Sequence, residues 1–368
     1  MQNKQQASLA QRLDITDNIR LYDPSNMTDL VISFPEQCRD AIDIGQQIDI
    51  NPPNNINSIL VTGLGGSAVG GDYLQILFNR FGCIPVAVNR DYDIPSWVNK
   101  ETLVFANSYS GNTEETLSAY SQAKVKGAHV FCLTSGGQLM SRAKDDGYPV
   151  ITIPGGQPPR ASLGYMFLPM VIMFMKWGWL PMGNSSQHTF DQLTGLRDDA
   201  NIDIPTEINF AKQLAVNLFG NLPLIYGESY KAVIANRWKC QFNENTKILA
   251  YANAYPELTH NEIMGWEQAK LQADNLAVLT LTDGLESPKM KTRMHVMTEK
   301  MNSAAFQQVI EFNVKHSGGS ETGDFLDRML RMTYLADFVS IYLAALYKVD
   351  PYIIGSINDL KSALSVVK

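Results

Sequence analysis

The sequence has few cysteines and no excess of positive charge. Its four cysteines are far apart and form neither a CxxC pair nor a cluster with histidine: Cys38, Cys83, Cys132 and Cys240. This spacing argues against a disulfide framework and predicts reduced, buried thiols and no metal site. The 30 Lys and Arg residues are outnumbered by 37 Asp and Glu, for a formal net charge of −7. We therefore expect no basic surface that would bind nucleic acid or an anionic membrane.

Long apolar runs are also missing. The N-terminal stretch MQNKQQASLAQRLD lacks the apolar core of a signal peptide. The most apolar stretch, Met166 to Met182, is short and is interrupted by Pro169, Lys176 and Pro181. It predicts a buried helix and not a membrane span. We therefore expect a cytoplasmic protein with no membrane partner.

The sequence does contain a series of short apolar runs, most of them followed by a helical stretch. In the first half they cover five ranges rich in Val, Ile and Phe: residues 59–66, 84–89, 103–111, 129–137 and 148–156. Three more follow in the second half: residues 222–229, 276–283 and 306–314. Continuous apolar runs that alternate with helices are typical of parallel sheets covered on both faces. We expect an α/β fold with mainly parallel, doubly wound sheets.

The two halves have a similar pattern, which predicts a duplication. The stretch ILVTGLGGSAVGGDYLQ resembles LPLIYGESYKAVIANRW, because each is a strand that ends in Gly-x-Gly or Gly-x-Ser before a helix. The length of 368 residues also favours two domains. We expect a long amphipathic helix before Pro351. The expected segments are an N-terminal helical segment (1–48), a first subdomain (49–185), a loop-rich linker (186–212) and a second subdomain (213–368).

A glycine-rich turn follows the first apolar run. The stretch VTGLGGSAVGG places Gly63, Gly65 and Ala68 in a G-x-G-x-x-A pattern. Small residues let backbone N–H groups approach a phosphate at a helix N-terminus, so Gly65 and Gly66 are candidate phosphate-binding residues. The pattern alone also fits a dinucleotide-binding turn, or a tight turn without a ligand. Ser67 adds a hydroxyl, which suits a phosphate monoester better than a bridging pyrophosphate.

A second loop, NSYSGNTEET, follows the third apolar run and is crowded with hydroxyl groups. Ser108, Ser110 and Thr113 lie where the loop passes into a helix that we expect to begin near Thr113. Hydroxyl and N–H groups can converge there on one phosphate, aided by the positive end of the helix. The alternative is simple capping, with Thr113 as the N-cap residue. One cap explains one residue and leaves Ser108, Ser110 and Gly111 unexplained, so we favour anion binding.

These two loops resemble the sugar-isomerase (SIS) domain, a doubly wound α/β module that binds phosphosugars. The pair GLGGSAVGGD and NSYSGNTEET is similar to a narrower group, the bifunctional phosphoglucose/phosphomannose isomerases. Three later stretches add to a resemblance that spans most of the chain: PPRASLGYMF, NENTK and ELTHNEIMGW. It implies two SIS-type subdomains, each a three-layer αβα sandwich, related by duplication. It also implies an aldose–ketose isomerase that interconverts glucose 6-phosphate and fructose 6-phosphate without a cofactor.

The resemblance assigns roles to residues outside the two phosphate loops. It implies that Glu244 is the base that moves a proton between two carbons through an enediol, and partial burial would raise its pKa usefully. It implies that His260 assists ring opening, and in the family's homodimers this His comes from the partner subunit. Lys361 matches a C-terminal family Lys that acts with the His. Arg160 would place positive charge beside the enediolate or the phosphate.

Most of these residues also have a simpler interpretation. Glu244 alone would be a solvated glutamate on a helix face, and Lys361 alone a solvated lysine. His260 could lie beside a capping box formed by Thr259 and Glu262. The other four histidines match no motif and are expected to be structural or exposed: His129, His188, His295 and His316.

Two features depart from the family pattern and leave alternatives open. Family members that accept mannose 6-phosphate often carry a Thr after the Pro of a Val-Asp-Pro-Thr stretch, but here Tyr352 follows Pro351. This favours glucose–fructose interconversion. The segment Gly284 to Met301 is more elaborate than the family core, and we assign it no role. The alternative functions are a non-catalytic phosphosugar sensor, an isomerase of another phosphosugar, and a nucleotide-dependent oxidoreductase.

Overall fold

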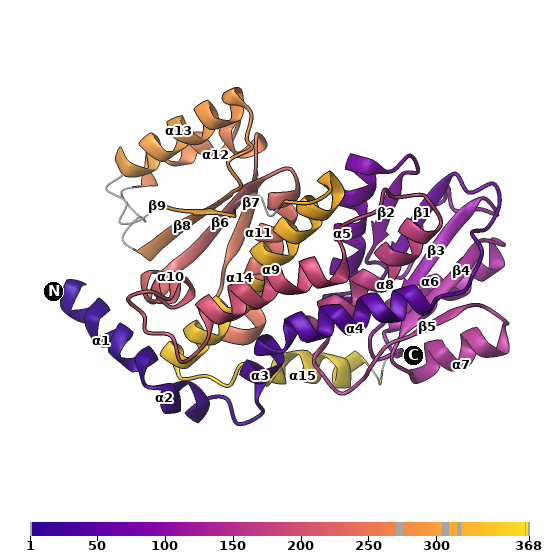
Figure 1. The fold of residues 1–368 in the computed structure, drawn as a ribbon, viewed down its shortest axis with the longest axis horizontal. Coiled ribbons are helices and arrows are strands. Elements are labelled where there is room, and N and C mark those ends of the chain that lie inside the picture. The colour runs from indigo at the N-terminus through magenta and orange to yellow at the C-terminus, as the bar shows by residue number, and fades with distance from the viewer. Residues whose placement is uncertain (1, 270–274, 304–308, 315–317, 365, 367–368) are drawn as a thin grey trace. The chain divides into compact units, whose positions relative to one another are not determined.

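The chain forms two compact units, each built on one parallel sheet (Figure 1). The structure, a computed structural model, describes residues 2–269, 275–303, 309–314, 318–364 and 366. The β1–β5 unit comprises Ser33–Leu193 and Ser317–Asp327. The β6–β9 unit comprises Met1–Ile32, Thr194–His316 and Arg328–Lys368.

The β1–β5 unit has a five-stranded parallel sheet in the order β2-β1-β3-β4-β5. The strands are β1 (Ser58–Thr62), β2 (Val86–Asn89), β3 (Thr102–Asn107), β4 (His129–Thr134) and β5 (Val150–Thr152). The helices are α4 (Phe34–Gln47), α5 (Gly66–Phe81), α6 (Glu114–Val125), α7 (Gly137–Asp145) and α8 (Leu163–Lys176). The five apolar runs of the first half are therefore confirmed as strands.

Helices cover both faces of this sheet, which is why its central strand reads as a continuous apolar run. All six residues of β3 are buried. Val104 and Ala106 pack in one cluster with residues of α6 and α7. Phe105 points to the opposite face, where its ring lies 5.6 Å from that of Phe174 in α8. Helices α4 and α5 pack on α8, so the unit is a three-layer αβα sandwich, as predicted.

The β6–β9 unit has a four-stranded parallel sheet in the order β7-β6-β8-β9. The strands are β6 (Leu222–Glu228), β7 (Tyr251–Tyr255), β8 (Leu276–Thr282) and β9 (Val309–Asn313). Residues 306–308 of the predicted last strand lie outside the described residues. Strand β7 was not predicted, because YANAY lies at the sheet edge and has few aliphatic residues. Its first side chain, Tyr251, is 55% exposed.

The helices of the β6–β9 unit come from the N-terminal segment and from the second half of the chain. Those that lie wholly within the unit are α1 (Gln2–Asp14), α2 (Thr16–Leu21), α3 (Met27–Ile32), α10 (Phe210–Leu218), α11 (Tyr230–Gln241), α12 (Glu262–Gly265), α13 (Pro288–Ser303) and α15 (Gly355–Leu364). Helix α11 packs on β6 and β7, and α1 packs on α10. Strand order and neighbours match those of the first sheet, with β6 in the place of β1 and β8 in the place of β3. The predicted α/β fold with a duplicated unit is confirmed.

Helix α14 (Glu321–Tyr347) is the long helix that we predicted before Pro351. Its 27 residues are long and apolar enough to cross a membrane by length and composition, but 94% of its most apolar window is buried inside the protein. It is therefore the core helix of a folded domain. The prediction of an amphipathic helix was wrong, because the helix is buried on nearly every side from Thr322 to Leu346.

The chain around residues 183–207 contains a helix that we did not predict, because the composition of this stretch is mostly polar. Helix α9 (Ser186–Ala200) occupies most of the stretch that we expected to be a loop-rich linker, and α10 begins before residue 212. Thr189 and Leu193 of α9 are buried, so one face packs although the segment is mostly polar. The N-terminal helical segment is confirmed as helical, but α1–α3 belong to the β6–β9 unit and α4 to the β1–β5 unit.

Candidate active site

The glycine-rich turn connects β1 to the N-terminus of α5. Gly65 has φ 54°, a conformation that favours glycine, and precedes the first helical residue. Gly63 lies so close to the end of β3 that an added Cβ would be 2.9 Å from the Asn107 carbonyl oxygen. Ser67 is buried, and its Oγ accepts a hydrogen bond from the backbone N–H of Tyr109 at 3.0 Å. The turn thus joins the hydroxyl-rich loop directly.

The hydroxyl-rich loop connects β3 to α6. Ser108 Oγ lies 2.9 Å from Thr113 Oγ1, and Ser110 is exposed. Thr113 is the N-cap residue of α6, but its side chain makes no cap hydrogen bond. The capping alternative is therefore wrong for the hydroxyl group, which faces Ser108 instead. Because β1 and β3 are adjacent and parallel, both loops lie at the carboxyl edge of the sheet, where α/β proteins bind ligands.

A third loop, after β4, holds the hydroxyl-rich loop in place. Gly111 has φ 70° and its N–H and C=O groups are both used: the C=O accepts from Leu139 N at 2.9 Å and the N–H donates to Ser108 O at 3.1 Å. Asn112 Oδ1 accepts from Gln138 N at 3.1 Å. Ser135 Oγ donates to Tyr109 O at 2.6 Å. Backbone and side-chain contacts with the loop after β4 therefore hold the hydroxyl-rich loop in place. Sequence reasoning did not identify this support.

Arg160 lies in a short 3₁₀ turn, Pro159–Ala161, that packs against the N-terminus of α5. A Cβ added to Gly66 would be 2.6 Å from Pro159 O and 3.0 Å from Arg160 N. Glycine at position 66 therefore permits this close approach. Arg160 is buried. The β1–β5 unit thus brings two helix N-termini and several hydroxyls together, with the backbone of Arg160 packed against one of these N-termini, which suits an oxyanion.

Glu244 lies in the β6–β9 unit on a π-helical turn, Phe242–Thr246, that continues α11. π-Helical turns are rare and frequent at functional sites. Two hydrogen bonds to Ser340 fix the turn to α14. Asn245 Nδ2 donates to Ser340 Oγ at 2.9 Å, and Thr246 Oγ1 donates to Ser340 O at 3.1 Å. Glu244 is half-buried. A carboxylate held on a fixed turn, partly open to solvent, can serve as a base.

His260 is exposed and lies between a 3₁₀ turn, Glu257–Thr259, and α12. The expected capping box is wrong, since Asn261 is the N-cap residue of α12 and its side chain accepts from Glu262 N. Thr259 cannot cap because it is part of the 3₁₀ turn, where its hydroxyl donates to Pro256 O.

The Glu262 side chain instead anchors the His260 segment. It accepts hydrogen bonds from the Tyr226 hydroxyl, from Asn253 Nδ2 at 2.6 Å and from Trp266 Nε1 at 3.3 Å. Burial and the Glu262 carboxylate raise the pKa of Tyr226, so this hydroxyl stays protonated and donates. The residue that our sequence analysis took for part of a cap is therefore a structural anchor two positions from His260.

The segment Gly284 to Met301, which sequence analysis left without a role, supports the same region. Most of it forms α13, whose buried residues Met294, Met297 and Met301 pack in one cluster with Tyr226, Tyr255, Leu258 and Trp266. Arg293 Nη1 also donates to Thr259 Oγ1 at 2.8 Å. Helix α13 therefore packs against the segment that carries His260.

The remaining predicted residues lie on other elements. Lys361 is exposed on α15. His129 and His295 are exposed, and His188 Nε2 lies 3.4 Å from the buried Asp327. His316 lies outside the described residues. Among the residues that the structure describes, no group of three or more His, Cys, Asp or Glu side chains is placed to hold a metal ion.

Similarity to known proteins agrees with this geometry. Residues 54–152 match the family described as the SIS domain, and residues 207–364 match the bacterial phospho-glucose isomerase C-terminal SIS domain. A structure of a hypothetical protein from Thermus thermophilus has the same fold, with a TM-score of 0.71 at 15% identity, over 98% of this chain and 95% of that chain.

Two curated relatives extend the similarity to nearly the whole chain. The bifunctional phosphoglucose/phosphomannose isomerase of Caldicellulosiruptor bescii is 42% identical over 93% of this chain and 100% of its own length. The Aquifex aeolicus protein of the same name is 34% identical over 83% of this chain and 90% of its own length. This chain belongs to the family of bifunctional phosphoglucose/phosphomannose isomerases.

Proposed function

We propose that this protein is an aldose–ketose isomerase that interconverts glucose 6-phosphate and fructose 6-phosphate. The observation that carries the proposal is the pair of loops after β1 and β3. They place buried and exposed hydroxyls at two helix N-termini, next to Arg160, in a chain whose relatives are named for this reaction. Membership of an enzyme family counts against the non-catalytic sensor.

The phosphate group of the sugar binds to the hydroxyl-rich and glycine-rich loops. Ser67, Ser108, Ser110 and Thr113 donate hydroxyl hydrogen bonds, and the backbone N–H groups of Gly65 and Gly66 add to them at the start of α5. The positive ends of α5 and α6 favour a dianion at this place. The support for this step is the 2.9 Å contact between the Ser108 and Thr113 hydroxyls, which brings two potential donors to one point.

Proton transfer uses the side chains of four residues in this proposal. Glu244 takes the proton from C2 of the open-chain aldose, which gives an enediolate, and returns it to C1 of the ketose while the O2 proton passes to O1. Arg160 stabilises the negative charge of the enediolate or the phosphate. His260 and Lys361 pass the proton to and from the ring oxygen when the ring opens and closes.

The assembly and the location are also proposals. A homodimer in which each subunit supplies His260 to its partner's site is supported by the exposure of this imidazole. A cytoplasmic location is supported by the four free cysteines, of which Cys38 and Cys132 are buried.

Mannose 6-phosphate is the second sugar to test. The relatives are named for phosphomannose isomerase as well as phosphoglucose isomerase. Against this, Tyr352 stands where mannose-accepting members often carry a Thr. Its backbone N–H donates to Asp350 Oδ1 at 2.7 Å, so the local turn is ordered. Acceptance of mannose 6-phosphate would show that this Thr is not required.

The test is a coupled assay with fructose 6-phosphate and, separately, mannose 6-phosphate, on the wild type and on Glu244→Gln. We expect glucose 6-phosphate formation that survives EDTA and falls by about 10²–10⁴-fold in Glu244→Gln, the usual contribution of general base catalysis. Glu299→Gln, a change of an exposed glutamate on α13, serves as the matched control. Full activity in Glu244→Gln would refute the base assignment, and no activity on either sugar would refute the isomerase.

A further inference from the structure

The β6–β9 unit repeats the backbone of the phosphate-binding turn. Ser229, the residue before α11, has φ 52° and ψ −128°, and Gly65, the residue before α5, has φ 54° and ψ −128°. A positive φ is uncommon for serine and costs free energy. Gly227 lies two positions earlier, as Gly63 does in the first turn. The duplicated strand, turn and helix therefore have the same local geometry in both units.

The side chains at corresponding positions differ. Ser67 follows Gly63 by four residues, and Lys231 follows Gly227 by four. In the first unit Thr62 pairs with Ala106, and Tyr109 lies three residues after Ala106.

In the second unit Tyr226 pairs with Thr280, and Asp283 lies three residues after Thr280. The pair Lys231–Asp283 therefore occupies the place that Ser67 and Tyr109 N–H occupy in the first unit.

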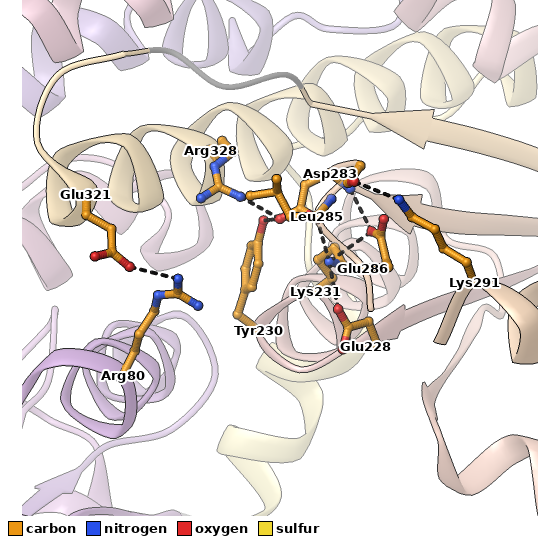
Figure 2. Close-up of polar contacts among 11 residues, drawn as sticks. Arg80, Glu228, Tyr230, Lys231, Asp283, Leu285, Glu286, Lys291, Glu321 and Arg328 are labelled. Carbon is orange, nitrogen blue, oxygen red and sulfur yellow. Dashed lines mark hydrogen bonds and ion pairs between the residues drawn. The ribbon is translucent and has the colours of Figure 1, made fainter. Parts of the chain in front are cut away.

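The Asp283 carboxylate is bound on both of its oxygens (Figure 2). Oδ1 accepts from Lys231 Nζ at 2.9 Å and from Leu285 N at 3.1 Å. Oδ2 accepts from the Tyr230 hydroxyl at 2.7 Å and from Arg328 Nη1 at 2.5 Å. Two cations, a hydroxyl and a backbone N–H are the donors that protein sites use to bind an oxyanion.

These charged groups are buried, so their positions are set by one another and not by solvent. The side chain of Lys231 is 1% exposed, and those of Asp283 and Arg328 are each 3% exposed. Burial alone would raise the pKa of Asp283, but the Tyr230 hydrogen bond and the Lys231 charge outweigh it and lower the pKa. Asp283 is therefore ionised at neutral pH.

Two further carboxylates lie around Lys231. Glu286 Oε1 lies 3.1 Å from Lys231 Nζ and also accepts from Asp283 N at 2.9 Å, and Glu228 Oε1 lies 3.1 Å from the same amine. Asp283 joins the hydroxyl of Tyr230, the guanidinium of Arg328 and the amine of Lys231 in one site.

We propose that the β6–β9 unit retains a second oxyanion site and that the Asp283 carboxylate occupies it as a built-in ligand. The site is closed to phosphosugars, so each chain binds one phosphate group although it carries two copies of the fold. The carboxylate joins α11, α14 and the loop after β8 in the way that a bound anion would. The proposal does not depend on the proposed function, because it concerns no reacting group.

Removal of the Asp283 side chain opens the site to a small carboxylate. In Asp283→Gly the lost group is a carboxymethyl, and acetate has the same shape and charge. We expect acetate to stabilise this variant saturably in urea unfolding of the full chain. At ten times its Kd, acetate raises the folded-to-unfolded ratio about elevenfold. Phosphate is larger and is expected to stabilise Asp283→Gly no more than it stabilises the wild type.

Asp283→Asn is the matched control, because its side chain fills the site and excludes acetate. Neutral acetamide has a similar shape to acetate but no charge, so it controls for the effect of shape alone. Sodium chloride at the same concentration controls for ionic strength. Stabilisation by acetate in Asp283→Gly, but not in Asp283→Asn or the wild type, supports the proposal. An equal response in all three proteins overturns it, and so does the absence of a response in Asp283→Gly.

A second variant keeps the proposal testable if Asp283→Gly does not fold alone. In Asp283→Ala the lost group is a carboxylate, which formate replaces. Refolding yields of both variants are then measured with and without the matching anion. Recovery by acetate for the glycine variant and by formate for the alanine variant supports the built-in ligand. If neither anion increases its yield above the sodium chloride control, the proposal is wrong.

Discussion

The hydroxyls of Ser67 and Thr113 have different surroundings, and this difference allows ligand binding to be separated from stability. Ser67 is 4% exposed and its Oγ accepts from the buried Tyr109 N–H. Thr113 is partly exposed and its Oγ1 contacts Ser108 Oγ at 2.9 Å. Both hydroxyls are proposed to bind the sugar phosphate. We therefore compare Ser67→Ala with Thr113→Val.

The two variants are expected to lose the same amount of substrate binding. A hydrogen bond to a charged group contributes about 1.5–3 kcal/mol, which corresponds to roughly 10–150-fold in kcat/KM. The phosphate does not react, so its contacts are made equally in the ground state and the transition state. The loss should therefore raise the KM for fructose 6-phosphate more than it lowers kcat.

Their stabilities should differ. Ser67→Ala leaves the Tyr109 N–H without its acceptor inside the protein, which costs about 1–3 kcal/mol of the free energy of unfolding. Thr113→Val removes no cap hydrogen bond but does remove the contact with the Ser108 hydroxyl, which can rotate toward another acceptor. It should therefore cost less than Ser67→Ala, about 0.5–1 kcal/mol.

Kinetic and urea-unfolding measurements on both variants test this reasoning. Ser118→Ala, on α6 but outside the loop, is the control and should resemble the wild type in KM. A KM within twofold of the wild type in Thr113→Val would show that this hydroxyl does not bind phosphate. Equal stability of Ser67→Ala and Thr113→Val would show that the Tyr109 N–H finds another acceptor.

Two further predictions concern the β6–β9 unit. Glu262→Gln keeps one acceptor oxygen but loses the one that binds Asn253, so the segment that carries His260 is anchored less firmly. We expect kcat to fall about tenfold with KM unchanged; an unaltered kcat would contradict an anchoring role. Burial raises the pKa of Asp337 to about 6 although the nearby Arg237 lowers it, so the native state binds this proton more tightly than the unfolded state. The free energy of unfolding of the wild type relative to Asp337→Asn should therefore fall by about 2.4 kcal/mol as the pH rises from 4 to 7. Equal differences between the two proteins in urea unfolding at both pH values would contradict it.

The sequence was sufficient for the elements whose pattern is local. The five strands of the first sheet are continuous apolar runs between polar turns, so each could be recognised by itself. The hydroxyl-rich loop was recognisable because Ser108, Ser110 and Thr113 lie within six positions of one another. Local patterns of this kind need no knowledge of tertiary contacts.

The rest depends on contacts between distant residues. Strand β7 is defined by its pairing with β6, and its own residues carry little β signal. Glu262 had the right spacing for a capping box, yet its partners Tyr226 and Asn253 were not local to that pattern. Asp283 is 52 positions from Lys231. The duplication could have provided a signal for this pair. Lys231 stands where the first unit has Ser67, and Asp283 follows directly after strand β8.

The division of the chain between the two units bears on the order in which they fold. The β1–β5 unit is almost continuous, since Ser33–Leu193 lacks only Ser317–Asp327. The β6–β9 unit is not, because its first segment, Met1–Ile32, has partners far along the chain: Arg12 binds Leu346 O over 334 positions. Contacts between distant positions form slowly, because a long loop must close first. During synthesis the first sheet can be complete before the C-terminal helices that contact α1–α3 have been made. The helices that are made first are therefore the last to be buried.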